Sequence, residues 1–407
     1  MLVLQGIGGV TSGTFIPLTI GFVLQNLRPA WWPYGIAAYG LNLELSLNIP
    51  ASLEGFYLDH FSWHWIFWQG SVLTVPMIIC IAIGMPRQPV NRVVLSQADV
   101  WGMLHLGTGF AMLYAALDQG NRLDWLNSGS IIGLLTGSAL LIASFMIRET
   151  TCLHPWIDLS FLVSRNIGLV MALLSLYRFI LLATSFLIPQ YLMTVQDFRA
   201  LQIGPVLLLI ALPQFILAPL VATILRFVDP RIVMAFGFTS ISVACLMAMQ
   251  LTARWQTWDF LPSQILQAVG QSSTLIALVL FAVRHLTPTE AFTFGAVLQT
   301  ARLLGGEIGY AFMQTYVRMA EQTQSYIVGL HVQDGFLRVQ QWLGTATVAL
   351  RLHGAPRYEV ADQSLDVLAK TVRIQANVLS IIDGFAACVI ASIAGLCLIT
   401  LLRPPKG

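Results

Sequence analysis

Charged residues are scarce in this sequence. Asp, Glu, Lys and Arg make up only 10% of its 407 residues, whereas a soluble domain carries about 25%. Hydrophobic residues account for 57% of the chain. A water-soluble domain of this length would have to expose many of them to solvent, so the composition excludes an ordinary soluble fold and favours a membrane protein.

Basic clusters and paired cysteines are also missing. The formal net charge is +2 and the sequence contains no run of Lys and Arg, so we expect no nucleic-acid partner. The five cysteines are scattered without a C-x-x-C pair, which indicates small apolar residues rather than disulfides or metal ligands. Gly6-x-Gly8 follows no predicted strand and therefore predicts no phosphate-binding loop. No cofactor or metal is expected.

Long hydrophobic runs are what the sequence does contain. A helix needs roughly 20 apolar residues to cross the hydrocarbon core, and its backbone must satisfy its own hydrogen bonds there. Eleven runs meet this need, at about 4–24, 35–57, 64–85, 100–117, 129–147, 167–194, 202–225, 232–252, 261–283, 291–317 and 377–402. The sequence therefore predicts an all-α, polytopic transmembrane helix bundle with about 11 spans.

Lys and Arg in the short loops define the expected orientation, because cytoplasmic loops are enriched in them. If the first span runs inward, ten of these residues face the cytoplasm: Arg28, Arg87, Arg92, Arg148, Arg165, Arg226, Arg231, Arg284, Arg403 and Lys406. Only three lie in short outer loops: Arg122, Arg199 and Arg254. We therefore expect a cytoplasmic C-terminus.

The first span carries a recognisable motif. Gln5, Gly6 and Gly9 are followed by Pro17, and Leu2 stands three residues before the Gln. This pattern resembles the fourth helix of major facilitator superfamily transporters, in which an arginine occupies the place of Leu2.

The second span carries a modified version of another motif. Pro50 and Gly55 precede the stretch 63–67, which reads Trp-His-Trp-Ile-Phe. The arrangement resembles the antiporter motif in the fifth helix of the same family and the entry to its sixth. Pro50 is offset by one position, and Glu54 stands where the first Gly of a pair is expected.

Two later segments complete the resemblance. Asp229 lies in the loop 226–231, which resembles the cytoplasmic loop after the tenth helix of the family. Gly305, Gly306 and Gly309 follow Arg302, as in the thirteenth helix. The order of these motifs is similar to that of the fourteen-span drug:proton antiporter branch, the EmrB/QacA type.

The resemblance implies a domain organisation. Residues 1–85 would be the remainder of an N-terminal helix bundle, 86–165 two linker spans with their cytoplasmic loops, and 166–407 a six-helix C-terminal bundle. The family's first three spans have no counterpart, and the chain begins at the edge of a span. We therefore expect this sequence to start partway through a larger protein.

Two acidic residues lie in the second span, Glu44 near its middle and Glu54 near its outer end. Ionisable groups inside a membrane are costly, and they are hypotheses for function by default. A low-dielectric cavity favours the neutral form of a carboxyl group, so either residue is a candidate proton carrier. The alternative for both is a carboxylate that pairs with an arginine or reaches the surface.

Four more ionisable residues lie in later spans. Arg178 and Arg302 keep their charge, and they would hold a carboxylate, an anionic substrate or a structural ion pair. Glu307 is five residues from Arg302 and does not share its helix face well, so we expect both to find partners on other helices. Asp383 is a candidate for the outer part of the cavity.

The glycines are interpreted as packing residues, because small side chains let membrane helices approach closely. Gly6, Gly8, Gly9 and Gly13 give the first span a smooth face, and Gly305, Gly306 and Gly309 do so in the tenth.

The segment 318–376 is the one sizeable region between spans, and we expect it outside the membrane. Residues 318–328 are predicted to extend the preceding helix. Phe336, Leu337, Val339, Trp342 and Leu343 then predict an amphipathic helix on the outer surface.

The leading hypothesis is a secondary active transporter in a bacterial inner membrane that exports hydrophobic or amphipathic small molecules in exchange for protons. A periplasmic adaptor protein is a candidate partner. The alternatives are a truncated remnant that does not transport and a membrane-embedded transferase. Single loop acids such as Asp59, Asp197 and Asp259 argue against the transferase, because such enzymes need clustered acidic or His residues. The sequence names no substrate.

Overall fold

The computed structural model describes residues 2–85, 99–152, 164–286, 291–332, 337–352 and 360–403. Every regular element in these ranges is a helix, which confirms the all-helical prediction. Arg87, Arg92 and Lys406, which contribute to the predicted orientation, lie outside the described residues, as does Phe336.

Nine helical stretches in the described part of the chain are long and apolar enough to cross a membrane. They belong to the helices α1 (Leu2–Asn26), α4 (Trp65–Gly84), α6 (Val100–Gly120), α7 (Gly129–Thr151), α9 (Arg165–Thr194), α10 (Ala200–Ile224), α11 (Pro230–Ala248), α12 (Leu261–Val283) and α15 (Val360–Thr400).

The other two predicted spans are helical but fall outside this set. The run 35–57 forms two helices, α2 (Trp32–Asn48) and α3 (Pro50–His60), of 17 and 11 residues. The interruption lies at Pro50, which has no N–H to continue the hydrogen bonding of α2. The run 291–317 lies within α13 (Ala291–Leu330), which is 40 residues long and carries Arg302 and Glu307.

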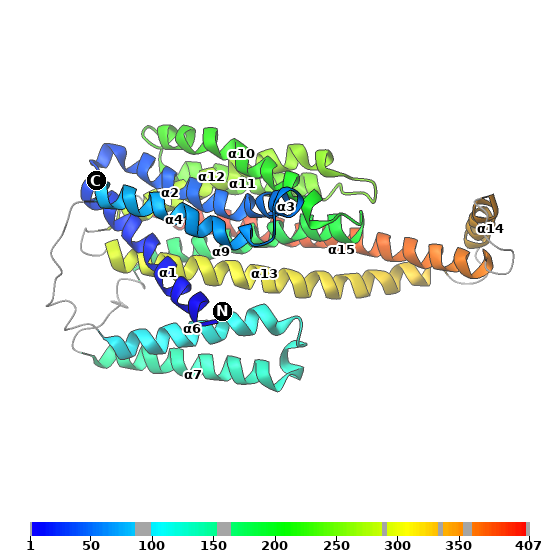
Figure 1. Ribbon diagram of the computed structural model, residues 1–407, viewed down its shortest axis with the longest axis horizontal. Coiled ribbons are helices and arrows are strands. Elements are labelled where there is room, and N and C mark those ends of the chain that lie inside the picture. Colours follow the sequence, from blue (N-terminus) through cyan, green and yellow to red (C-terminus); the bar gives the residue numbers. More distant parts are fainter. Residues whose placement is uncertain are drawn as a thin grey trace.

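Six helices, α9 to α13 and α15, pack together as the larger bundle (Figure 1). The most buried of them is α12, which lies between α10 and α11. Glycines allow the closest approaches: a Cβ added at Gly305 would lie 2.6 Å from Cα of Ser175, and one at Gly309 would collide with the backbone of Phe179. Gly305, Gly306 and Gly309 therefore lie where α13 and α9 approach closely.

The N-terminal helices lie along one side of this bundle. α1 packs against α13, where Pro17 approaches Gly295, and α2 packs against α10 and α12. α3 packs on α10, with Gly55 against Leu201. The glycine face of α1 is different: no described atom lies within 4 Å of a Cβ added at Gly6, Gly8, Gly9 or Gly13. Close packing of that face is not observed, because nothing in the described structure lies against it.

The helices α6 and α7 form a separate antiparallel pair beside α13, the linker hairpin (Figure 1). At one end Asp99 receives two hydrogen bonds from Arg148 and caps α6 by accepting from the N–H of Gly102. At the other end the indole N–H of Trp125 donates to Oγ1 of Thr315 on α13, at 2.9 Å. Asp99 and Arg148 thus join α6 to α7 at the end of the hairpin away from its turn, and Trp125 attaches the turn to the larger bundle.

α13 and α15 extend together well beyond the other helices, and α14 (Leu337–Leu352) lies at their far end (Figure 1). The predicted extension of the tenth span over 318–328 is confirmed. The predicted helix is confirmed as α14, but it packs on α15 at the tip of the pair instead of lying on the bundle, and it buries no residue. About 13 helical residues beyond position 317 carry it about 20 Å away.

Candidate functional site

Glu44 is the most buried acidic residue of the predicted set. It lies on α2, is 2% exposed, and faces α9. The hydroxyl of Tyr177 on α9 donates a 2.8 Å hydrogen bond to its Oε1, while its Oε2 has no hydrogen-bond partner. Glu44 therefore joins the N-terminal helices to the larger bundle with half of its hydrogen-bonding capacity unused.

Two guanidinium groups act on this carboxyl from the larger bundle. Arg178 is next to Tyr177 on α9 and is 8% exposed, and Arg302 is half-buried on α13. Both interact electrostatically with Glu44, although no ion pair within 4.0 Å joins them to it among the described residues. The Nε of each arginine is buried without an acceptor. The structure thus brings together three of the six ionisable residues predicted from the sequence.

Sequence reasoning missed three members of this cluster. Tyr177 supplies the hydrogen bond to Glu44 and also approaches the carbonyl of Gln271 on α12, at 3.5 Å. Tyr39, five residues before Glu44 on α2, has a buried hydroxyl without a partner, and the side-chain oxygen of Gln271 is likewise unsatisfied. All three lie in apolar helical runs, where neither periodicity nor charge distinguishes them from core residues.

The charges of this cluster do not cancel when Glu44 is ionised. One carboxylate faces two guanidinium groups, in a part of the protein that is remote from water. Unsatisfied polar atoms and unbalanced charges are costly in such surroundings. An arrangement of this kind favours an exchangeable partner, such as a proton, a water molecule or a polar group of a ligand.

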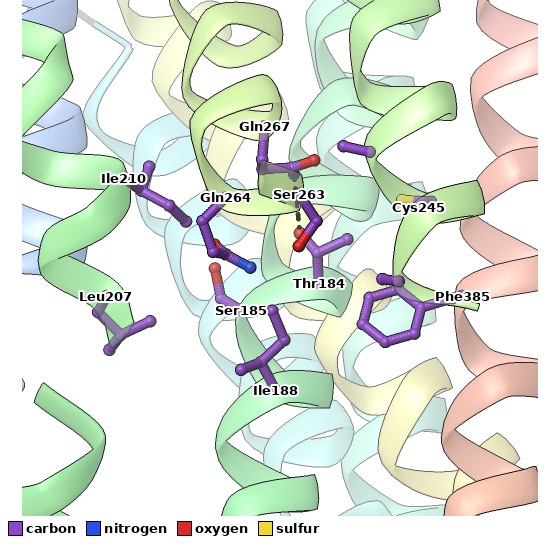
Figure 2. Close-up of a pocket in the computed structure, with 12 residues that line it drawn as sticks. Thr184, Ser185, Ile188, Leu207, Ile210, Cys245, Ser263, Gln264, Gln267 and Phe385 are labelled. Atoms are coloured by element: carbon purple, nitrogen blue, oxygen red, sulfur yellow. Dashed lines mark hydrogen bonds between the residues drawn. The ribbon is translucent and has the colours of Figure 1, made fainter. Parts of the chain in front are cut away.

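A second polar region lies deeper in the larger bundle, between α9, α10, α11, α12 and α15 (Figure 2). The amide of Gln267 donates to Oγ1 of Thr184 at 3.1 Å, and Ser263 and Gln264 point into the same space. This cavity has a volume of about 20 Å³, enough for one water molecule. A drug-sized ligand needs a pocket of about 300–1,000 Å³, so the cavity in this conformation is too small for such a ligand.

The three other predicted ionisable residues lie elsewhere. Glu54 is exposed on α3. Glu307 is 4% exposed and interacts with Tyr114 of α6, on a different face of α13 from Arg302, as their spacing predicts. Asp383 on α15 accepts a 3.0 Å hydrogen bond from Gln324 of α13.

The motif residues have structural partners where the structure describes them. Asp229 caps α11 by accepting from the N–H of Arg231 and forms an ion pair of 2.9 Å with the same residue. These contacts hold the pKa of the Asp229 carboxyl below its usual value. Pro50 begins α3, and the side chain of Gln5 lies outside the described residues.

The family model of the Major Facilitator Superfamily, which describes the sequences of that family, matches residues 1–310 of this chain. The probable multidrug resistance protein EmrY of Escherichia coli strain K12 is 24% identical over 321 residues, which cover 75% of this chain and 60% of that protein. The multidrug export protein EmrB of the same strain is 24% identical over 318 residues, covering 76% and 60%. The fatty acid resistance protein FarB of Neisseria gonorrhoeae is 22% identical over 418 residues, covering 100% and 78%. The matched region thus spans about 60% of the length of the first two relatives.

Proposed function

Since the chain belongs to the major facilitator superfamily, we propose that it exports hydrophobic or amphipathic small molecules and couples this export to proton entry through Glu44. It is an integral membrane protein, with nine described helical stretches suited to spanning a bilayer. Its relatives include proteins named for multidrug export and for fatty acid resistance. These names supply the proposed substrate class.

The contact between Glu44 and Tyr177 is the observation that carries the proposal. Transporters with repeated bundles move one bundle against another around a central site. An ionised Glu44 accepts the hydrogen bond from α9 and offsets part of the charge of Arg178 and Arg302. A proton on Glu44 removes that negative charge, which leaves the two guanidinium groups less compensated and weakens the hold of α2 on the bundle.

The size of this effect suits a transport cycle. A hydrogen bond to a charged group contributes about 1.5–3 kcal/mol. A change of that size alters the ratio of two conformations by about 10- to 100-fold, since each 1.4 kcal/mol is a factor of ten. Proton binding at a single carboxyl would therefore bias the conformational equilibrium without locking it.

The domain organisation that we propose is the one that the resemblance to the family implies. Residues 1–85 form part of an N-terminal bundle, 86–165 include the linker hairpin, and 166–407 form the C-terminal bundle. We place the C-terminus in the cytoplasm and the tip formed by α13, α14 and α15 on the opposite side. This tip is the surface that we propose for a periplasmic adaptor protein.

Uncoupler-sensitive efflux from cells that make this chain tests the proposal. The cells are loaded with a panel of fluorescent hydrophobic compounds, and membrane insertion is checked by tag accessibility. Lower accumulation than in empty cells, restored by an uncoupler, is the expected result. An inserted chain without efflux of any compound favours the alternative of a non-transporting remnant.

A further inference from the structure

One face of α13 carries a row of polar residues that leads away from the Glu44 cluster. Glu307, Tyr310, Gln314, Arg318 and Glu321 recur every three or four positions, which places them on one side of a helix. The row begins at a buried carboxyl and ends on the protruding part of α13. It therefore connects the interior of the bundle with the outer end of the structure.

Glu307, at the inner end of this row, is incompletely satisfied. It is 4% exposed, it interacts with Tyr114 of α6, and its Oε1 has no hydrogen-bond partner. Tyr114 and Asp118, one turn apart on α6, are the titratable groups that act on it. The described residues of α1, α9 and α15, which also pack against α13, contribute none.

A cavity of about 420 Å³ lies along the outer part of the same row. Its polar lining comes from α9, α13, α15 and the end of the linker hairpin: Gln190, Gln314, Arg318, Glu321, Asn377 and Asn121. The side-chain oxygen of Asn121 is buried there without a hydrogen-bond partner. Since one water molecule occupies about 30 Å³ of liquid, the cavity has room for a cluster of waters that would satisfy this oxygen.

An aromatic pair joins the lining of the cavity to the turn of α13 next to Glu307. The rings of Phe186 on α9 and Tyr310 on α13 meet edge to face, with centroids 5.4 Å apart. Phe186 lines the cavity, and Tyr310 lies one turn from Glu307. The pair therefore lies where a water-filled entrance would meet the carboxyl.

The end of the linker hairpin forms a further wall of the cavity, through Asn121. Its tip is attached to α13 by Trp125, which donates to Thr315, and by Arg318, which donates to the carbonyl of Asn121 at 3.2 Å. These contacts position Tyr114 and Asp118 next to the polar row.

We propose that Glu307 is a second proton-binding carboxyl, reached from the extracytoplasmic side through the cavity between the linker hairpin and α13. The proton passes from water in the cavity to Oε1 of Glu307 and returns to water, so that an O–H bond is the one bond formed and broken. The side of entry and the use of a proton gradient rest on the proposed function.

Carbodiimide labelling of the full chain in membranes tests proton binding directly. Dicyclohexylcarbodiimide adds to protonated carboxyl groups in apolar surroundings, and peptide mass spectrometry locates the adduct. We expect modification of Glu307, several-fold greater at an outside value of about pH 6 than at about pH 8. The exposed Asp362, near the start of α15, is the internal control and should react little. An unmodified Glu307, or modification that does not change with pH, overturns the proposal.

Cysteine labelling tests the entrance. Gln314→Cys should react with a membrane-impermeant maleimide applied outside, above the background of the wild-type chain with its five native cysteines. Phe312→Cys is the matched control, because it lies at a similar depth but on the apolar outer surface, 42% exposed. Equal labelling of the two variants, or none at Gln314→Cys, contradicts the proposed path.

Neither readout requires transport. Labelled Glu307 in a chain without efflux leaves this site standing and removes the proposed function. Efflux that depends on Glu44, with Glu307 unlabelled, removes the second site alone.

Discussion

The hydroxyl of Tyr177 and the carboxyl of Glu44 meet at 2.8 Å across the boundary between α9 and α2. Tyr177 is fully buried, and Glu44 is 2% exposed. Because a proton on Glu44 changes this contact and the charge seen by Arg178 and Arg302, the pair links a chemical event to the packing of two helices.

Tyr177→Phe should slow proton-coupled export while leaving the packing intact. The substitution removes the hydroxyl that donates to Glu44 and keeps the aromatic ring in the core. Loss of a hydrogen bond to a charged group costs about 1.5–3 kcal/mol, which corresponds to a rate about 10- to 100-fold lower. The rate of efflux per inserted molecule is the measurement. Tyr57→Phe, on α3 and away from the cluster, is the matched control, and equal rates for the two variants would contradict the role of Tyr177.

Arg178→Met and Glu44→Gln should interact in a double-mutant cycle of stability. Each change alone leaves the opposite charge less compensated in a buried site, so each should lower the free energy of unfolding. In the double variant, the loss in free energy of unfolding should be about 1 kcal/mol smaller than the sum of the losses in the two single variants. Thermal unfolding in detergent measures all four proteins. Additive effects would show that Arg178 does not act on Glu44.

Gly309→Ala should destabilise the protein, and Gly9→Ala should not. A Cβ at position 309 collides with the backbone of Phe179 and would force α13 away from α9, whereas a Cβ at position 9 meets no described atom. Overpacking of this kind costs about 1–3 kcal/mol. The unfolding temperatures of the two variants provide the comparison. Similar temperatures would contradict the close contact of α9 and α13.

Asp99→Asn should weaken the contact between α6 and α7 at the end of the linker hairpin where Asp99 meets Arg148. Hydrogen bonds from Arg148, together with the N–H of Gly102, hold the pKa of the Asp99 carboxyl below its usual value. Its stabilising effect is therefore present above the unfolded pKa of about 3.9 and is lost as the pH falls through the lower folded pKa. The variant should be about 1–3 kcal/mol less stable near neutral pH.

Unfolding experiments at several pH values measure the Asp99 effect. The wild-type chain should lose part of its stability below about pH 4, and Asp99→Asn should lose less over the same range. Parallel curves for the two proteins would show that Asp99 does not contribute through its charge.

The sequence predicts the helices well, because a span is a property of a continuous run of residues. The interruption at Pro50 and the position of α14 are less predictable. The first depends on whether a proline ends a helix or bends it. The second depends on how far α13 and α15 extend beyond the other helices.

The candidate site is predictable only where charge reveals it. Glu44, Arg178 and Arg302 stand out from their apolar surroundings, but Tyr177 lies 133 residues from Glu44 in the sequence and has no local signal. The glycines show the same limit. Gly9 and Gly309 belong to similar small-residue patterns, yet only Gly309 has a helix packed against it in the described structure. A smooth face permits contact, but the rest of the fold decides whether contact occurs.

The claim that Glu44 couples protons to transport is tested most directly in proteoliposomes, with a substrate from the efflux panel. Glu44→Gln should abolish accumulation driven by a pH gradient and retain exchange of labelled for unlabelled substrate, which requires no net proton movement. Asp59→Asn, an exposed acid on α3, should behave like the wild-type chain in both assays. Accumulation by Glu44→Gln at the wild-type level would contradict the account.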